Sequence, residues 1–353
     1  YGVLKLTKTS MLNATETSYD KCIYWISFPF DVKVSEIFGV EKYGEVWAIS
    51  NYRGDLPAQK GWFKQDTQTF WEFLKPSDIM KANVGYTLNL DPDYFNKESS
   101  EPWKNSATEV AWYFPSIKEK VGIVSLAQKD TTLEPMRCTI DREFNAGTDD
   151  KPRMVNHKFT DSNWRVIGVP AFQNLQAPTM TPTEGVDDKV FGLTGFYEWV
   201  PATNTYTAQS TDGYPFHATH SYMVQYEGTI RWSNAAVITT NKAPWHAPEY
   251  TYADAKNYSI KLEFGNEAYT DQTFVTLIEK ASTDFVLNED MMKIDNAGFP
   301  NIYSFAGAYD VAYNETKMEN QSVMLGVSAP KDGSYTFAMP KDFSGKAVLV
   351  DLE

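Results

Sequence analysis

Apolar side chains along this chain alternate with polar ones or gather in short apolar runs. The run from Cys22 to Val32 is almost wholly apolar, is rich in aromatic and β-branched residues, and is interrupted by Pro29. Because such side chains pack well on a pleated surface, the run predicts a buried strand. A similar run, with Pro170, returns from Trp164 to Phe172. The pattern therefore predicts two strands of the same kind.

Each of these runs opens a longer stretch with the same order of features. An aromatic middle segment follows, from Trp47 to Tyr52 or from Tyr197 to Tyr206. An Ala-x-x-x-Tyr motif then opens an alternating strand, at Tyr86 in the first stretch and at Tyr222 in the second. The shared order favours an internal repeat, and a chance similarity between two β-rich stretches is the alternative.

The two candidate units span about 20–92 and 160–234. Trp25 and Trp164 lie at even offsets before the prolines of their strands. Because strand side chains alternate, both tryptophans are expected on the same side of their strands.

The rest of the first 240 residues is also read as mostly strands. A helical turn closed by glycine is expected at Val34 to Gly39, and a short helix at Lys75 to Ala82. The further predicted strands are Val3 to Thr9, Glu45 to Ser50, Gly85 to Leu90, Ala111 to Phe114, Val121 to Leu126 and Met136 to Ile140.

A proline-rich segment, 241–248, is the best linker in the chain, and the pattern changes after it. Clean alternation recurs in 249–353, where one short helix is expected at Phe285 to Lys293. The alternating segments are Tyr258 to Phe264, Thr273 to Ile278, Val323 to Val327, Ser334 to Met339 and Lys346 to Val350. Strands at this spacing predict an antiparallel β-sandwich. The chain is thus expected to be all-β, with antiparallel β-sandwich modules in tandem and a few short helices, over regions 1–240 and 249–353.

Composition changes this picture in two ways. Aromatic residues make up 15% of the 353 residues, which further favours strands. The formal net charge of −14 argues against nucleic acid or an anionic membrane as partner, because both are polyanions. No apolar run approaches the ~18–20 residues that cross a bilayer, so membrane insertion is not expected. Since the chain starts at Tyr1 without a basic, apolar leader, we expect that a leader or upstream region has been removed.

Two cysteines, Cys22 and Cys138, leave two interpretations open. One disulfide would suit an exported protein, and two small buried thiols are the alternative.

Motifs for metal or catalytic chemistry are weak. His217 and His220 are three residues apart just before a strand, where such positions point to opposite faces, so two ordinary imidazoles are favoured over zinc. The acidic loops Asp91-x-Asp93 and Thr148-Asp149-Asp150 lack EF-hand spacing, so calcium is kept only as an alternative to solvated turns. Nucleophile-elbow, zinc-protease and phosphate-loop motifs are absent from the sequence. We therefore expect no cofactor and no enzyme activity.

Aromatic side chains among polar ones provide the one positive signal for binding. Trp62 and Trp71 lie in a polar segment of the first unit, and Tyr197, Trp199 and Tyr206 lie in the matching part of the second. Exposed flat rings would form a stacking platform for a sugar or peptide. The alternative is that these rings fill the core, as large aromatics usually do.

Several segments resemble a β-sandwich module near the C-terminus of large exported proteins of Bacteroides-type bacteria, together with the repeats that precede it. The segments are Trp25 to Phe30, Gly85-Tyr86, Tyr269 to Thr273, Ala281 to Phe285, Lys293-Ile294, Pro300 to Ser304, Asn314 and Leu325 to Phe337. The resemblance implies a secreted or surface-exposed, non-catalytic assembly. It also implies that the last sheet continues past Glu353 in a longer protein.

These observations together predict a non-catalytic exported surface protein that acts as an adhesion, interaction or structural module. Its partner is expected to be a glycan or a protein at the cell surface, and the sequence does not decide its oligomeric state. A carbohydrate-binding module that uses the aromatic segments is the first alternative. A glycan-active hydrolase with dispersed carboxylates is the second, because separation in space defines such a pair.

Overall fold

The computed structural model divides the chain into two compact units, Tyr1–Ala247 and Pro248–Glu353, so the boundary falls inside the proline-rich segment 241–248. We call them unit 1 and unit 2. The residues described are 2–7, 22–37, 39–52, 59–60, 68–69, 71–82, 84–91, 109–114, 137–138, 164–169, 174–175, 177, 179–181, 191–192, 195–211, 214–225, 229–231, 258–278, 281–287, 289–317 and 322–341. Among these residues the regular elements are strands and two short 3₁₀ helices, and the sheets are largely antiparallel. The predicted all-β fold is confirmed.

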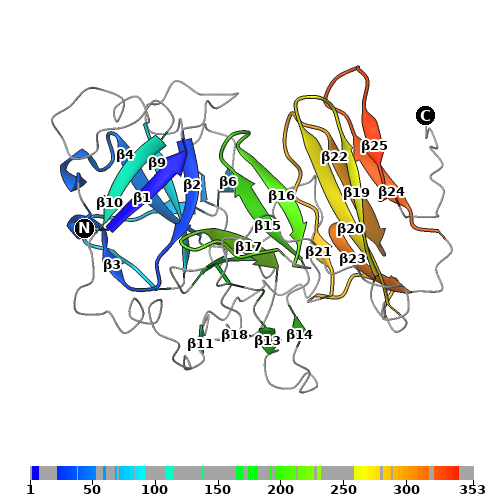
Figure 1. Cartoon of the computed structure of the whole chain (residues 1–353), viewed down its shortest axis with the longest axis horizontal. Coiled ribbons are helices and arrows are strands. Elements are labelled where there is room, and N and C mark those ends of the chain that lie inside the picture. The colour runs from blue at the N-terminus through cyan, green and yellow to red at the C-terminus, as the bar shows by residue number, and fades with distance from the viewer. Residues whose placement is uncertain are drawn as a thin grey trace. The chain divides into compact units, whose positions relative to one another are not determined.

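The first sheet of unit 1 has four strands in the order β2-β9-β4-β7, of which Figure 1 labels β2, β9 and β4. The strands are β2 (Cys22–Ser27), β9 (Gly85–Leu90), β4 (Trp47–Tyr52) and β7 (Trp71–Phe73). β2 ends two residues before Pro29, because proline has no N–H to offer a ladder. The predicted buried strand is therefore present but shorter than the run of apolar residues.

One face of this sheet carries the core of the first half of unit 1. Tyr24, Ile26 and Phe28 alternate along β2 and its end, and they are buried with Trp112 and Phe114. The last two residues belong to β10 (Glu109–Phe114), which pairs with β1 (Gly2–Thr7). The ring centroids of Phe28 and Phe114 are 4.8 Å apart.

Short elements close the edges of this half. The predicted helical turn is present as η1 (Val34–Glu36), and η2 (Val40–Lys42) follows Gly39, whose φ of 83° is left-handed. The remaining pairs of unit 1's first half are β3 (Val32–Lys33) with β8 (Ile79–Met80) and β5 (Gln59–Lys60) with β6 (Gln68–Thr69).

A second four-stranded sheet has the order β12-β17-β15-β16, built from β12 (Trp164–Gly168), β17 (Ser221–Gln225), β15 (Gly195–Val200) and β16 (Thr205–Ser210). In chain order, both sheets therefore read first, fourth, second, third. A smaller sheet contains β11 (Arg137–Cys138), β18 (Thr229–Arg231), β13 (Thr179–Thr181) and β14 (Phe191–Gly192).

The Ala-x-x-x-Tyr motif makes the same hydrogen bonds in both sheets. The hydroxyl of Tyr86 accepts the Lys81 N–H at 2.7 Å, and the hydroxyl of Tyr222 accepts the His217 N–H at 2.8 Å. In the next position, the N–H of Ala82 donates to Asp31 Oδ1 at 2.9 Å, and the N–H of Ala218 donates to Asn174 Oδ1 at 3.0 Å. Shared strand order and shared hydrogen bonds both support the internal-repeat interpretation.

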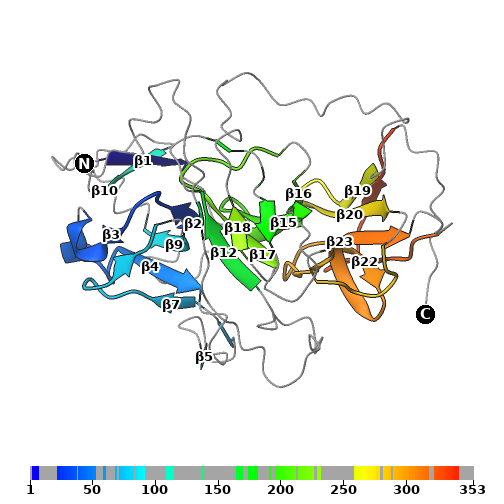
Figure 2. The ribbon, with the colours of Figure 1, turned by 90° about the horizontal axis from the view of Figure 1, so that it is seen from below.

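The two sheets also meet through a reciprocal pair of contacts. Ile26 pairs with Tyr86 in the first sheet, and Ile167 pairs with Tyr222 in the second, so the two isoleucines are equivalent. Ile26 bridges to His220, two residues before Tyr222, and Ile167 bridges to Val84, two residues before Tyr86. Figure 2 shows β12 and β17 beside β2 and β9.

Small residues allow this close approach. A Cβ added at Gly85 would lie 2.4 Å from Val166 Cγ1 and 2.5 Å from Ser221 Cβ. The Ser27 hydroxyl donates to the carbonyl of His220 at 2.6 Å and accepts the Val169 N–H at 3.1 Å. The two halves of unit 1 therefore share one tightly packed junction.

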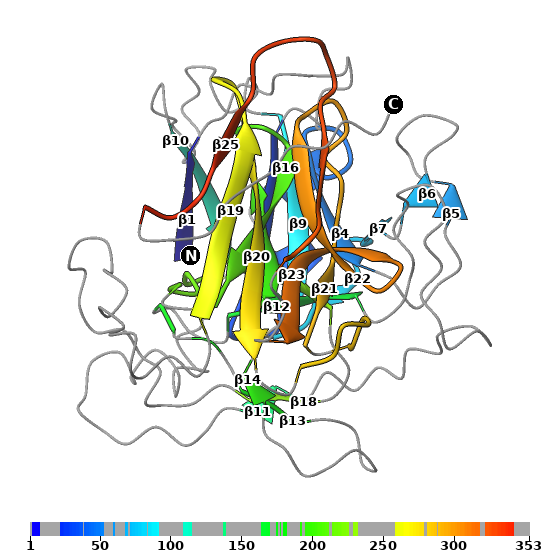
Figure 3. The ribbon, with the colours of Figure 1, turned by 90° about the vertical axis from the view of Figure 1, so that its right-hand side faces the viewer.

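Unit 2 is one curled sheet in the order β24-β22-β23-β20-β19-β25, with β21 added beside β23 (Figure 3). The strands are β19 (Tyr258–Gly265), β20 (Thr270–Ile278), β21 (Met291–Met292), β22 (Asn301–Ala306), β23 (Tyr309–Lys317), β24 (Leu325–Ser328) and β25 (Thr336–Ala338). All pairs are antiparallel except β20 with β23, which is parallel. Its inner face buries Ile260, Leu262, Val275 and Ile302.

The two predicted short helices are wrong. At Lys75 to Ala82, the Asp78 carboxylate accepts the Lys75 N–H at 2.7 Å and closes a turn, after which β8 begins. At Phe285 to Lys293, the Asp290 carboxylate accepts the backbone N–H groups of Val286 and Glu315, and β21 follows. In both places a carboxylate competes with the helix for backbone donors.

Candidate functional site

The predicted aromatic platform is partly assembled around Trp25. Trp71 from β7, Trp199 from β15 and Tyr206 from β16 all contact Trp25, with ring centroids 5.4, 5.9 and 5.7 Å from it. Tyr52 of β4 packs against Trp71 at 5.4 Å. We call these five residues the aromatic cluster. It joins the two sheets of unit 1, so residues that are far apart in sequence meet on one seam.

The members of the aromatic cluster differ in burial. Trp25 is 6% exposed and Tyr52 is 7% exposed, whereas Trp71, Trp199 and Tyr206 are half-buried. Trp25 stacks on Trp199 with planes 5° apart, which covers one face of the Trp199 ring. Only part of these rings is open to solvent.

The polar edges of the half-buried rings point inward. Trp199 Nε1 donates to the carbonyl of Ile23 at 2.8 Å. Trp71 hydrogen-bonds to the hydroxyl of Tyr206, whose pKa is raised above its ordinary value, chiefly by burial. These groups are therefore committed to the protein, and a ligand would meet ring faces instead.

Tyr197 does not join this surface. Tyr197 is 0% exposed and packs against Trp164 at 5.8 Å, so its interpretation as an exposed ring does not hold. Its neighbour Phe196 is also 0% exposed, so both faces of β15 are covered here, which the sequence of β15 alone does not reveal. Trp62 lies outside the described residues.

A second group on unit 1, which we call the Glu198 cluster, contains Glu198, Tyr214, His217 and Tyr222. The hydroxyl of Tyr214 hydrogen-bonds to the Glu198 carboxylate and to the hydroxyl of Tyr222. Burial, reinforced by the charge of Glu198, raises the pKa of Tyr214. Burial also raises the pKa of Tyr222. Both phenols therefore stay protonated, and the Tyr222 hydroxyl also accepts the His217 N–H.

His217 completes the Glu198 cluster. Its ring lies 5.8 Å from that of Tyr214 and 5.5 Å from that of His220. Burial, with a smaller effect from His220, lowers the pKa of His217, so its imidazole is neutral at pH 7. Sequence reasoning singled out the histidine pair but missed Glu198, because a lone glutamate in a strand gives no signal.

The metal hypotheses receive no support from the described residues. Nowhere among them do three or more His, Cys, Asp or Glu side chains gather as they would around a metal ion. Asp91 is half-buried, whereas Asp93, the loop 148–150 and the side chains of Cys22 and Cys138 lie outside the described part. The calcium and disulfide alternatives on those residues stay predictions.

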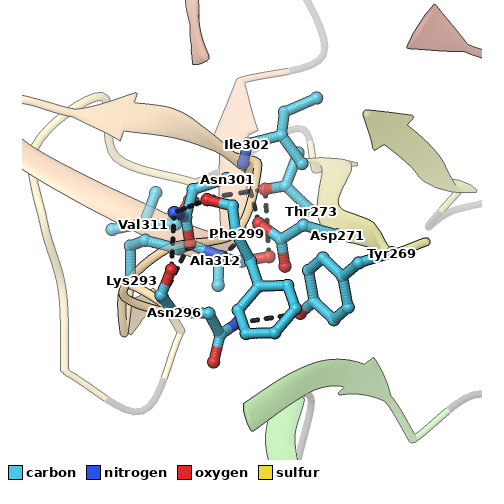
Figure 4. A network of polar contacts seen from close by, with 10 residues as sticks. All are labelled: Tyr269, Asp271, Thr273, Lys293, Asn296, Phe299, Asn301, Ile302, Val311 and Ala312. Carbon is cyan, nitrogen blue, oxygen red and sulfur yellow. Dashed lines mark hydrogen bonds and ion pairs between the residues drawn. The ribbon is translucent and has the colours of Figure 1, made fainter. Parts of the chain in front are cut away.

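Unit 2 contains a buried polar network that the sequence did not suggest (Figure 4). At its centre the Lys293 ammonium contacts Asp271 Oδ2 directly, and the two side chains are 1% and 0% exposed. The Ile302 N–H donates to the same Oδ2 at 2.7 Å. Asp271 is the second residue of β20, and Lys293 directly follows β21. Alternation alone gives Asp271 no reason to be buried, so only the structure reveals the pair.

Neighbouring polar groups complete this network. Asn301 Oδ1 accepts the Asn296 N–H at 2.8 Å, and its Nδ2 donates to the carbonyls of Asn296 and Phe299. Asn296 Nδ2 donates to the Tyr269 hydroxyl at 2.8 Å. Buried polar groups that satisfy each other in this way fix one arrangement of a core.

A second buried carboxylate lies on the same unit. Asp290 is 3% exposed and accepts the N–H groups of Val286 and Glu315 at 2.8 and 2.9 Å. Burial raises the pKa of Asp290 to about 7. This group therefore titrates near neutral pH.

Comparisons of the chain with protein-family models, with curated proteins and with solved structures find no match. Among the described residues, no helix has the length and apolar character needed to cross a membrane.

Proposed function

We propose that this chain is a non-catalytic structural or interaction module of an exported surface protein. One observation carries the proposal. The side chains with the most evident chemistry are used to hold β-layers together. Trp199 and Trp71 direct their indole N–H groups inward, and the buried Lys293–Asp271 contact lies in the core of unit 2. The export and surface assignment rests on the sequence resemblance given above.

A structural module of this kind depends on stable packing between its sheets. The aromatic cluster joins two sheets that are far apart in sequence, and the reciprocal contacts of Ile26 and Ile167 close the same junction. Aromatic pairs add about 0.5–1.5 kcal/mol each beyond the area they bury. The arrangement stabilises a rigid module.

A second candidate, carbohydrate binding, is favoured by one specific observation. Trp71, Trp199 and Tyr206 lie together and are only half-buried, so parts of these residues remain on the surface of unit 1. A ring face beside polar side chains can stack on a sugar.

A glycan array and a panel of polysaccharide and peptide substrates test these alternatives on the full chain. The structural proposal expects neither glycan binding nor turnover. Glycan binding that is lost in Trp71→Ala but kept in Tyr335→Ala would establish the carbohydrate-binding candidate instead. Turnover that is lost in Glu198→Gln would overturn both and would place an active site at the Glu198 cluster.

A further inference from the structure

The Lys293–Asp271 contact differs from other lysine–carboxylate pairs of the chain. Lys81–Asp31 and Lys261–Glu263 are surface pairs, whose side chains are 62% and 39% exposed in the first and 45% and 37% exposed in the second. Lys293 and Asp271 are 1% and 0% exposed. Water hydrates the surface pairs but does not reach the buried one.

A buried ion pair is costly, because both charges lose their hydration and the geometry must compensate for it. Here the compensation is incomplete. Among the described residues, Asp271 Oδ1 has no well-formed hydrogen bond, although it is fully buried. A neutral amide at this place would remove both charges from the core and would leave Oδ1 as a carbonyl oxygen.

We propose that Lys293 and Asp271 are a modification site, at which the two side chains condense into an intramolecular isopeptide bond. The bond would link the start of β20 to the segment that follows β21. The inference does not depend on the proposed function.

The step balances without any further reactant. One proton passes from the Lys293 ammonium to the Asp271 carboxylate, which gives a neutral amine and a neutral acid. The Nζ lone pair then attacks Cγ, a C–N bond forms and the C–Oδ2 bond breaks. Oδ2 leaves as water with the acid proton and one amine proton, and Oδ1 remains as the amide oxygen.

Three features of the site favour this step. Nζ is held against the carboxyl group by the fold, and such enforced proximity replaces a collision of two free molecules. The Ile302 N–H donates to Oδ2 at 2.7 Å and so holds the carboxyl group in place beside Nζ. Burial raises the pKa of Asp271 and so favours the neutral acid, which is the form that can lose water.

Intact-mass spectrometry of the full chain under denaturing conditions tests the proposal. We expect a mass lower than that of the sequence by one water molecule. A tryptic digest then locates the bond, because an amidated Lys293 is not cleaved. We expect one branched peptide that joins residues 262–280 to residues 281–317.

Two variants serve as matched controls. Lys293→Arg keeps the positive charge but cannot form the amide, so it should show the unmodified mass. Lys261→Arg changes a surface pair and should keep the loss of water. If wild type has the mass of its sequence and yields linear peptides 281–293 and 294–317, the proposal is overturned. A loss of water mapped to other residues overturns it equally. The wild-type result decides the question even if Lys293→Arg fails to fold.

Discussion

The indole ring of Trp25 lies parallel to that of Trp199, with ring centroids 5.9 Å apart and planes 5° from parallel. The two residues belong to different sheets of unit 1, so their stacking is a direct contact between its two halves. We expect Trp199→Ala to lower the free energy of unfolding of unit 1 by about 3 kcal/mol, from lost burial and a lost hydrogen bond.

Urea unfolding followed by tryptophan fluorescence checks this, because all ten tryptophans precede Pro248 and so report on unit 1. Ile79→Ala is the control, since Ile79 is 46% exposed and its truncation should cost less than about 0.5 kcal/mol. Equal effects of the two substitutions would show that the stack does not stabilise the junction.

Gly85 permits the close approach of the two sheets. A Cβ at this position would meet Val166 and Ser221 at distances no packed carbon tolerates, so Gly85→Ala should destabilise unit 1 by about 1–3 kcal/mol. Adding Ser221→Gly removes one of the clashing carbons. The double variant should therefore lose less free energy of unfolding than the sum of the losses in the two single variants. Strictly additive unfolding energies would argue that the sheets separate to admit the methyl group.

The hydroxyl groups of Tyr86 and Tyr222 should contribute equally to the free energy of unfolding if the two sheets are equivalent. Each hydroxyl accepts the N–H of the residue five positions earlier, so Tyr86→Phe and Tyr222→Phe each leave one backbone donor without its partner. We expect each to cost about 1–3 kcal/mol in urea unfolding. Ser77→Ala, which removes only a 3.4 Å surface contact, is the control. A large effect in one sheet and none in the other would contradict the equivalence.

Asp290 should make unit 2 sensitive to pH. Folding raises the pKa of Asp290 from its ordinary 3.8 to about 7, so the folded unit holds this proton more tightly than the unfolded chain does. The resulting stabilisation is fully present below about pH 4 and is lost as pH rises through about 7. Its size is on the order of a few kcal/mol.

Calorimetric melting of the full chain between pH 5 and 8 tests this. Unit 2 contains no histidine, so no imidazole of unit 2 titrates between pH 5 and 8. The melting temperature of unit 2 should fall as pH rises, and Asp290→Asn should flatten that slope. Asp332→Asn, at an exposed turn, should leave it unchanged. A slope that survives in Asp290→Asn would assign the pH dependence to another group.

Local signals in the sequence were sufficient for much of the fold. Aromatic and β-branched runs located β2 and β12, and alternation located β9, β17 and most strands of unit 2, because these patterns report directly on a half-buried pleated surface. The predicted helices failed where Asp78 and Asp290 take backbone N–H groups, a contact that depends on where the chain turns.

The sites depended on contacts that sequence does not encode locally. The sequence singles out Trp71, Trp199 and Tyr206 but indicates for Trp25 only its side of the strand. The contacts of these rings with Trp25 arise only when two distant sheets come together. Asp271 and Lys293 lie in segments that carry the family resemblance, but nothing in those segments predicts a buried pair. Their burial follows from the curl of one sheet, which places β20 and the end of β21 around the same point.

The reciprocal bridges at the centre of unit 1 have a consequence for its two halves. Ile26 reaches the partner half at His220, and Ile167 reaches back at Val84, which is how two identical subunits contact each other across a two-fold axis. The arrangement of unit 1 is thus similar to that of a dimer whose two subunits are covalently connected. The two halves complement each other through different side chains at equivalent positions, because Gly85 of one half leaves room for Ser221 of the other.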